Sequence, residues 1–139
     1  MKPQKINKDL TIIPSVGFGN KVIIRSLLAS EKPAAIIIFT DSRFFKHIFE
    51  MEDEIHEVCP IIWWHVWDNR PTPKFNEKLY KSVDTINCIS DLTYMMCKEI
   101  CPEKVEYIPH SFPDNVFYKL TNKSIEKYKN KILKEKKDW

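Results

Sequence analysis

The chain has 139 residues, 43% hydrophobic and 29% charged, which suits one globular domain and excludes a disordered protein. The net charge is +3, and eight of the 22 basic residues lie from Lys119 onward against three acidic ones, so the rest is close to neutral. We interpret this lysine-rich segment as a solvated helix face, because no arginine cluster or aromatic RNA-binding motif indicates a nucleic-acid binder.

The sequence contains no segment that predicts membrane insertion or secretion. The longest wholly apolar run, Ala34–Phe39, is far shorter than a membrane span, and no signal-peptide pattern is present. Four cysteines without a secretion signal favour free thiols in a reducing compartment. We therefore expect a cytoplasmic protein with no firm indication of membrane contact.

Short apolar runs alternate with amphipathic segments from the start of the chain, as in parallel α/β sheets. Residues 1–18 read as a polar lead-in, and a helix is predicted from about Asn20 to Ser30. Ala34–Phe39 is predicted as a continuous apolar strand, typical of a sheet covered on both faces. One helix is predicted over residues 43–58, on a single apolar stripe formed by Phe44, Ile48, Met51, Ile55 and Val58.

The alternation continues through the second half of the chain. The predicted elements are strand Pro60–Val66, helix Phe75–Ser82, strand Thr85–Ile89, a helix from Asp91 to about Ile100 capped by Ser90, strand Val105–Ile108 and a helix from about Lys123 to Lys136. With right-handed crossovers this order predicts a doubly wound, Rossmann-like α/β fold with a mostly parallel sheet flanked by helices. We divide the chain into a lead-in (1–19), the Rossmann-like domain (20–120) and a lysine-rich helix or linker (121–139).

Polar side chains follow every predicted strand, at the edge where open parallel sheets bind ligands. Thr40, Asp41, Ser90 and Asp91 are mostly explained as helix caps, but His65 is not. It lies among three tryptophans, and an imidazole can take a proton from a sugar hydroxyl near neutral pH. The competing interpretation is a core histidine satisfied by a backbone carbonyl, among tryptophans that only pack.

Two weaker motifs favour structural explanations. Gly17-Phe18-Gly19 precedes a helix, but a lone Gly-x-Gly indicates a turn more than a phosphate site. Cys97 and Cys101 are four residues apart on a predicted helix, and His56 or Cys59 would be needed to complete a metal site. Buried free thiols are the better explanation, so we expect no metal and no cofactor.

Three segments occur in a fixed order: Pro60–His65, Val83–Thr93 and Val105–Phe117. The first resembles the strand that ends in the acceptor-site histidine of group 1 glycosyltransferases with the GT-B fold, particularly bacterial and phage members. The second resembles that family's D-x-I-x-x-I-S-x-x-T pattern, and the third its V-x-Y-I-P-H/N-G-V-D-x-x-x-F pattern. The resemblance runs from Lys32 to about Leu120 and departs at Ser111, where the family has glycine.

The resemblance implies the N-terminal, acceptor-side half of an enzyme that moves a sugar from a nucleotide sugar to a glycan or other hydroxyl acceptor. It implies His65 as an acceptor-side catalytic residue, and as substrate-binding residues Trp64, Asp68, Asn69, Ser90 and His110. The nucleotide sugar would be held by a missing C-terminal donor domain or a separate donor-domain chain, so we expect this chain alone to be inactive. The alternatives are a stand-alone, non-catalytic Rossmann-like binding or interaction module, and a subunit of a split transferase.

Overall fold

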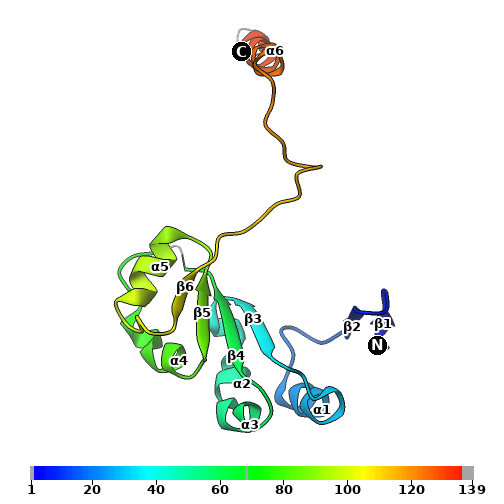
Figure 1. Cartoon of the computed structure of the whole chain (residues 1–139), viewed down its shortest axis with the longest axis vertical. Coiled ribbons are helices and arrows are strands. Elements are labelled where there is room, and N and C mark those ends of the chain that lie inside the picture. Colours follow the sequence, from blue (N-terminus) through cyan, green and yellow to red (C-terminus); the bar gives the residue numbers. More distant parts are fainter. Residues whose placement is uncertain (1, 68, 136–139) are drawn as a thin grey trace. The chain divides into compact units, whose positions relative to one another are not determined.

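The structure of the chain is a computed structural model that describes residues 2–67 and 69–135 (Figure 1). The chain forms two compact units, Met1–Pro109 and His110–Trp139. The first unit contains a two-stranded hairpin, a four-stranded sheet and helices α1 to α5, and the second contains helix α6.

An antiparallel hairpin lies at the start of the first unit, where β1 (Gln4–Lys5) pairs with β2 (Thr11–Ile12). The sequence predicted only a polar lead-in here, because two-residue strands are too short to give a readable alternation. The loop that follows places Gly17 and Gly19 at φ of +60° and +88°, which glycine adopts without steric cost. These two glycines therefore serve a turn.

Helix α1 (Lys21–Glu31) begins where the sequence predicts it. The Asn20 side chain caps the helix by accepting a hydrogen bond from the Ile23 N–H at 3.1 Å. Arg25 forms an ion pair with Glu54 of α3 at 2.6 Å, which places α1 beside the helices that follow the first sheet strand.

The central sheet has four parallel strands in the order β3-β4-β5-β6. These strands are β3 (Ile36–Thr40), β4 (Ile61–His65), β5 (Thr85–Cys88) and β6 (Val105–Tyr107). Each prediction of a strand is confirmed, with bounds that differ by at most two residues. The α/β class with a parallel sheet and accompanying helices is confirmed, and it is consistent with a Rossmann-like arrangement.

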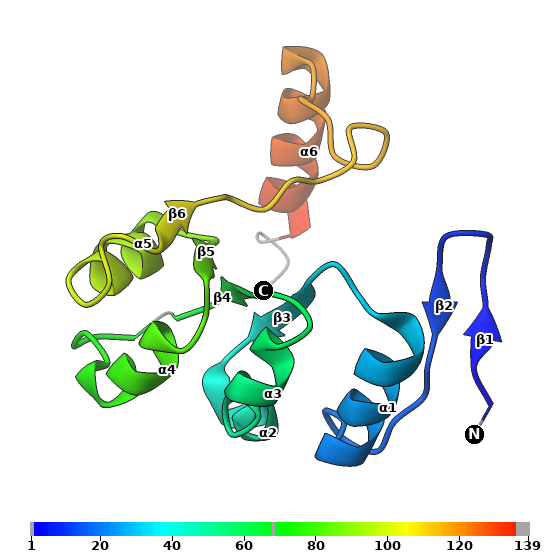
Figure 2. The same ribbon diagram turned by 60° about the horizontal axis from the view of Figure 1, so that its bottom comes forward.

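The helices of the first unit lie on one face of this sheet, as Figure 2 shows for α1, α3 and α4. A right-handed crossover that always steps to the next strand in the same direction returns each connecting helix to the same face. A doubly wound sheet needs a reversal of strand order, and the described strands have none. The prediction of a doubly wound sheet is therefore wrong for these strands.

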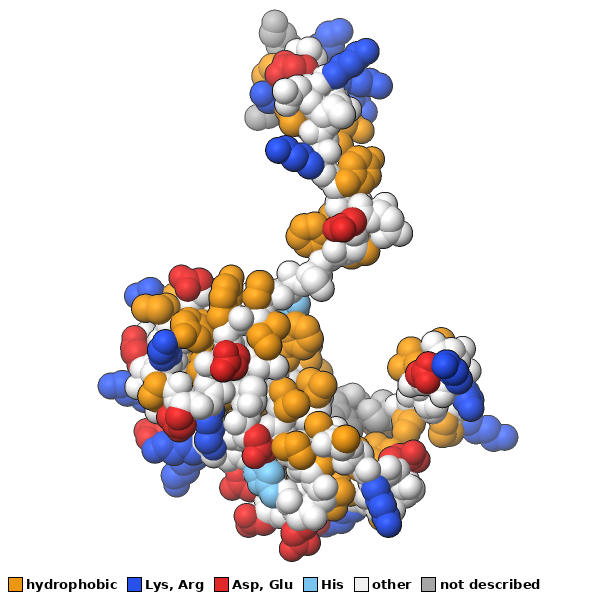
Figure 3. Space-filling view, viewed as in Figure 1, with side chains coloured by type: hydrophobic (Ala, Val, Ile, Leu, Met, Phe, Trp, Pro, Cys, Tyr) orange, Lys and Arg blue, Asp and Glu red, His pale blue; other side chains and the backbone are white. Residues whose placement is uncertain are grey.

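Alternate strand residues divide between the two faces of the sheet. Ile38, Trp63 and Ile86 are paired across three strands, are at most 3% exposed and pack against the helices. Ile37 and Phe39 point to the other face and are 63% and 48% exposed. Figure 3 shows hydrophobic side chains gathered over the strands of the first unit.

The segment 43–58 is not the single helix that its apolar stripe predicted. It forms the 3₁₀ helix η1 (Ser42–Phe44) and the short helices α2 (Lys46–Phe49) and α3 (Glu52–His56). The backbone leaves the helical conformation at Phe45 and Met51, where φ is −117° and −115°. These breaks turn Phe49 into the core, whereas Phe44 and Val58 of the predicted stripe are 42% and 44% exposed.

The remaining helices lie close to their predicted positions. They are η2 (Lys74–Asn76), α4 (Glu77–Lys81), α5 (Asp91–Lys98) and α6 (Asn122–Glu135). Ser90 caps α5 as predicted, since its hydroxyl accepts a hydrogen bond from the Thr93 N–H at 3.1 Å. Within the described residues, no helix has both the length and the apolar character needed to span a bilayer.

Candidate functional site

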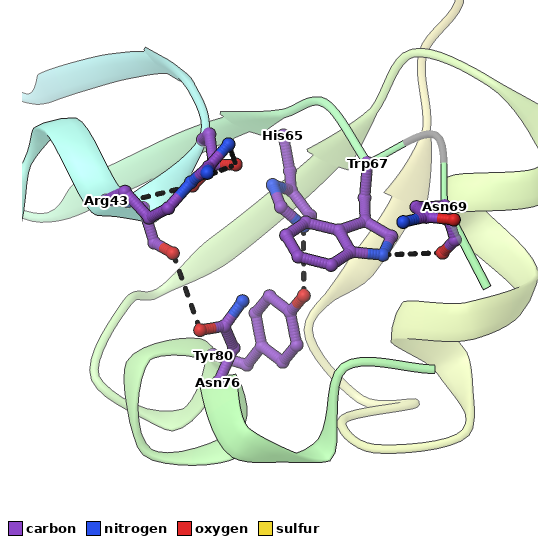
Figure 4. A network of polar contacts seen from close by, with 8 residues as sticks. Arg43, His65, Trp67, Asn69, Asn76 and Tyr80 are labelled. Atoms are coloured by element: carbon purple, nitrogen blue, oxygen red, sulfur yellow. Dashed lines mark hydrogen bonds and ion pairs between the residues drawn. The ribbon is translucent and has the colours of Figure 1, made fainter. Parts of the chain in front are cut away.

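A pocket of about 260 Å³ lies beyond the carboxyl ends of β3 and β4. Its walls come from η1, from the loop after β4 and from η2, and they are formed by Asp41, Arg43, Val66, Trp67, Asn69, Phe75 and Asn76. The pocket therefore sits at the sheet edge where the sequence predicts the candidate residues, and it combines two aromatic rings with polar side chains. Figure 4 shows Arg43, Trp67, Asn69 and Asn76 of this lining together with His65 and Tyr80.

His65 is the last residue of β4 and lies fully buried next to this pocket. Its Nε2 is 3.0 Å from the Tyr80 hydroxyl oxygen, whereas its Nδ1 is buried without a hydrogen-bond partner among the described residues. The imidazole lies against the Trp63 ring, with centroids 4.1 Å apart, and the Trp67 ring is 6.2 Å away. His65 is thus enclosed by aromatic rings, with Tyr80 as the hydrogen-bond partner of Nε2 and the Cys97 thiol nearby.

Tyr80 comes from α4 and reaches the sheet edge from below His65 (Figure 4). Burial of its side chain raises the pKa of the phenol, so the hydroxyl keeps its proton at neutral pH. Asn76 precedes Tyr80 by four residues, a spacing that places both side chains on the same side of this helical segment.

Asp41 and Arg43 form an ion pair at the rim of the pocket. The Asp41 carboxylate accepts hydrogen bonds from the Arg43 backbone N–H at 2.9 Å and from the Arg43 Nε at 3.0 Å. Partial burial disfavours ionisation of Asp41, but the bonds from Arg43 outweigh it and lower the pKa below its ordinary value. The pair brings two opposite charges to the rim, so the pocket wall carries little net charge.

Asn76 is only 5% exposed although it lines the pocket. Its Oδ1 accepts a long hydrogen bond, 3.5 Å, from the Ser42 hydroxyl. Its Nδ2 is buried and has no partner with hydrogen-bond geometry among the described residues. Figure 4 shows the Asn76 side chain beside Tyr80. The pocket floor thus holds an unused hydrogen-bond donor.

Trp67 closes the pocket on the side of His65. Thr93 fixes the Trp67 backbone at both ends, accepting from its N–H at 3.3 Å and donating to its carbonyl at 2.7 Å. The indole Nε1–H donates to the Asn69 carbonyl at 2.7 Å, and the ring meets Phe75 edge-on with centroids 5.9 Å apart. The backbone is held by the α5 cap region, whereas the indole is held by one hydrogen bond and one ring contact.

The structure distributes the remaining predicted residues over several places. Asn69 lines the pocket, and Ser90 acts as the α5 cap and bonds the Thr93 hydroxyl at 2.9 Å. Trp64 points to the opposite face of β4 from His65, where it meets Phe39 edge-on. His110 belongs to the second unit. The predicted Asp68 lies outside the described residues.

Sequence reasoning missed four residues of this region: Arg43, Phe75, Asn76 and Tyr80. They belong to short helical segments that follow or connect strands, where no alternation points to one sheet edge. The four-residue spacing of Asn76 and Tyr80 was the one usable signal, because it places a polar and an aromatic side chain on one helical face.

The four cysteines are free and buried. Cys88 and Cys97 lie close to each other and to His65 and Tyr80: hydrogen bonding with Cys88 lowers the pKa of the Cys97 thiol, and the same contact raises that of Cys88. Cys97 is therefore the member of this pair that loses its proton first. In residues 2–67 and 69–135, no group of three or more His, Cys, Asp or Glu side chains could hold a metal ion.

A larger pocket of about 670 Å³ lies between α5 and the loop Arg70–Thr72. Two of its polar side chains are already paired, since the Thr72 hydroxyl donates to Glu99 at 2.8 Å. None of the buried, unpartnered side-chain atoms of the described residues belongs to its lining residues. The smaller pocket beside His65 is therefore the better candidate site.

Comparisons of the chain with protein-family models, with curated proteins and with solved structures found no match.

Proposed function

We propose that this chain forms the acceptor-side half of a GT-B glycosyltransferase, which moves a sugar from a nucleotide sugar to a hydroxyl acceptor. The observation that carries the proposal is the pocket beside His65, at the carboxyl ends of β3 and β4. It offers Trp67 and Phe75 rings to the apolar face of a sugar and polar groups to its hydroxyls. The three sequence segments that resemble the family, one of which ends in His65, add to this support.

In this proposal His65 acts as the base toward the acceptor. With the proton on Nε2 and donated to Tyr80, the lone pair of Nδ1 is free to take the proton of an acceptor hydroxyl. The acceptor oxygen then bonds to the anomeric carbon of the donor sugar. The bond from that carbon to the diphosphate breaks, and its electron pair leaves with the phosphate oxygen.

The nucleotide sugar binds to a donor domain, in the same polypeptide or in a separate chain, as in a split transferase. The family pattern to seek there is Glu-x7-Glu. A cytoplasmic location belongs to the proposal too, in keeping with the four free cysteines.

One observation favours a second candidate, the non-catalytic binding module: His65 is fully buried, and a base must reach its substrate. The two candidates differ in whether His65 meets the ligand. A catalytic role requires displacement of Trp67, whereas a binding module can leave His65 in its present contacts.

The test is transfer of labelled sugar from nucleotide sugars to glycoside acceptors, measured for this chain alone and with a donor domain added. We expect no transfer by the chain alone, transfer by the combination, and a loss of about 10²-fold or more for His65→Gln. Strong transfer by the chain alone would show that no separate donor domain is needed. Unchanged transfer by a folded His65→Gln protein would rule out His65 as the base, and no transfer by the combination would favour the binding module.

A further inference from the structure

Two buried polar atoms beside the pocket lack partners among the described residues: the Nδ1 of His65 and the Nδ2 of Asn76. An unpaired polar atom in a protein interior has lost its hydrogen bonds to water without a replacement, so native structures rarely keep one without a reason. Here the two belong to neighbouring residues of one site, since both side chains adjoin Tyr80 (Figure 4). A ligand that enters from the pocket would supply the missing bonds.

Asn76 itself lines the pocket, whereas His65 does not, and Trp67 is the lining residue whose ring lies beside His65. The Trp67 ring is 6.2 Å from the His65 ring, and it contacts the ring of Phe75, which is 78% exposed. Because Thr93 holds the Trp67 backbone, the indole can turn aside by breaking its hydrogen bond to the Asn69 carbonyl and its ring contact with Phe75. A side-chain rotation is therefore sufficient to open the site.

The walls also limit the charge and size of the ligand. The Asp41 carboxylate lies next to the Arg43 guanidinium at 2.9 Å, so an acidic ligand would meet a negative charge beside the positive one. The volume, about 260 Å³, is below the roughly 300–1,000 Å³ typical of sites for drug-sized ligands. These properties suit one neutral ring that carries several hydroxyls.

We propose that the pocket binds a neutral hexopyranose, whose hydroxyls form hydrogen bonds with Asn76 and His65 once Trp67 has turned aside. This inference rests on the proposed function for the class of substrate and adds the selection of neutral over acidic sugars. Asn76 is then a binding residue, Trp67 is the gate, and the Asp41–Arg43 pair excludes sugar acids.

The experiment is a titration of the full chain with methyl α-glucopyranoside and, separately, with glucuronate, followed by NMR at the Trp67 indole N–H. The Trp67→Phe variant assigns that resonance. We expect a saturable shift with the neutral glycoside and binding at least about tenfold weaker with glucuronate. No saturable shift with the neutral glycoside, or equal binding of the two sugars, would overturn the inference.

Asn76→Leu separates a binding role from a structural one. It removes the unpaired Nδ2 donor and keeps a similar size, so binding should fall about tenfold or more. Urea denaturation of the variant measures separately the loss of the Ser42 hydrogen bond to Oδ1. Asn87→Leu makes the same change on the opposite face of the sheet and should leave binding unchanged. If Asn76→Leu binds as well as the natural protein, the inference fails.

Phe75→Ala keeps the test decisive if Asn76→Leu does not fold. Phe75 lines the pocket but is largely exposed, so its loss should weaken sugar binding several-fold without unfolding the protein; unchanged binding would contradict the inference. Sugar binding without transfer in the presence of a donor domain would sink the proposed function and leave this inference standing. Transfer that does not depend on Asn76 would overturn this inference and leave the proposed function standing.

Discussion

The two faces of the four-stranded sheet differ in what covers them. On one face Ile38, Trp63 and His65 lie under the helices and are at most 3% exposed. On the other face of the same strands, Ile37 and Phe39 are about half exposed or more. One step along a strand therefore changes the environment of a side chain completely, because successive side chains point to opposite faces.

This alternation also separates the two residues that the sequence put side by side in the site. His65 lies on the helix-covered face and adjoins the pocket, whereas its neighbour Trp64 lies on the uncovered face. The exposed apolar side chains on the uncovered face form a surface that commonly marks a contact site. The chemistry of the candidate site therefore belongs to the helix-covered face alone.

The largest effect on the free energy of unfolding is expected from a matched pair of substitutions on β3. Ile38→Ala should lower the free energy of unfolding by about 2–5 kcal/mol, because it leaves a cavity in the core. Ile37→Ala, one residue earlier, should cost less than about 1 kcal/mol. Urea denaturation of both variants measures the difference, and equal losses would show that both faces are covered in solution.

A smaller effect is expected inside the covered face at the His65 contact. Tyr80→Phe removes the hydroxyl 3.0 Å from His65 Nε2 and leaves that nitrogen buried without its partner, which should cost about 1–3 kcal/mol. Tyr94→Phe, whose hydroxyl is bonded by Lys98 at the surface, should cost less than about 0.5 kcal/mol. The measurement is again the unfolding free energy, and a neutral Tyr80→Phe would mean that His65 has another partner.

The smallest effect concerns Asp84, which ties α3 to the start of β4. Burial opposes its ionisation, but hydrogen bonds from the Ile61 N–H at 2.8 Å and from His56 at 3.0 Å lower its pKa below the ordinary 3.8. Its contribution is therefore complete above about pH 5 and is lost as the pH falls through the lowered pKa. Since half of the side chain is exposed, solvent screening keeps this contribution below about 1 kcal/mol.

Asp84→Asn should accordingly lower the urea midpoint at pH 7 and converge with the natural protein as the pH falls below about 4. Asp9→Asn, on the exposed hairpin, is the control and should change little at either pH. A difference that persists unchanged below pH 3 would show that Asp84 acts through packing and not through its charge.

Several elements could be predicted from the sequence because their signals are local. The caps at Asn20 and Ser90 and the apolar runs of β3 and β4 stand in the sequence as short contiguous patterns, and the structure confirms them. The broken helix over 43–58 was not readable. Its apolar stripe had the right spacing, but burial of Phe49 in the core outweighed the continuous helix.

By itself the sequence determined the order of the elements, the parallel α/β class and the position of His65 at a strand end. Only the tertiary structure decided which face of the sheet the helices cover and which groups surround His65. A two-residue alternation defines two faces but does not say which is buried, because that depends on strand order. Tyr80, the hydrogen-bond partner of His65, is 15 residues away along the chain. It reaches His65 because of where the crossover places helix α4, and no local sequence pattern predicts that placement.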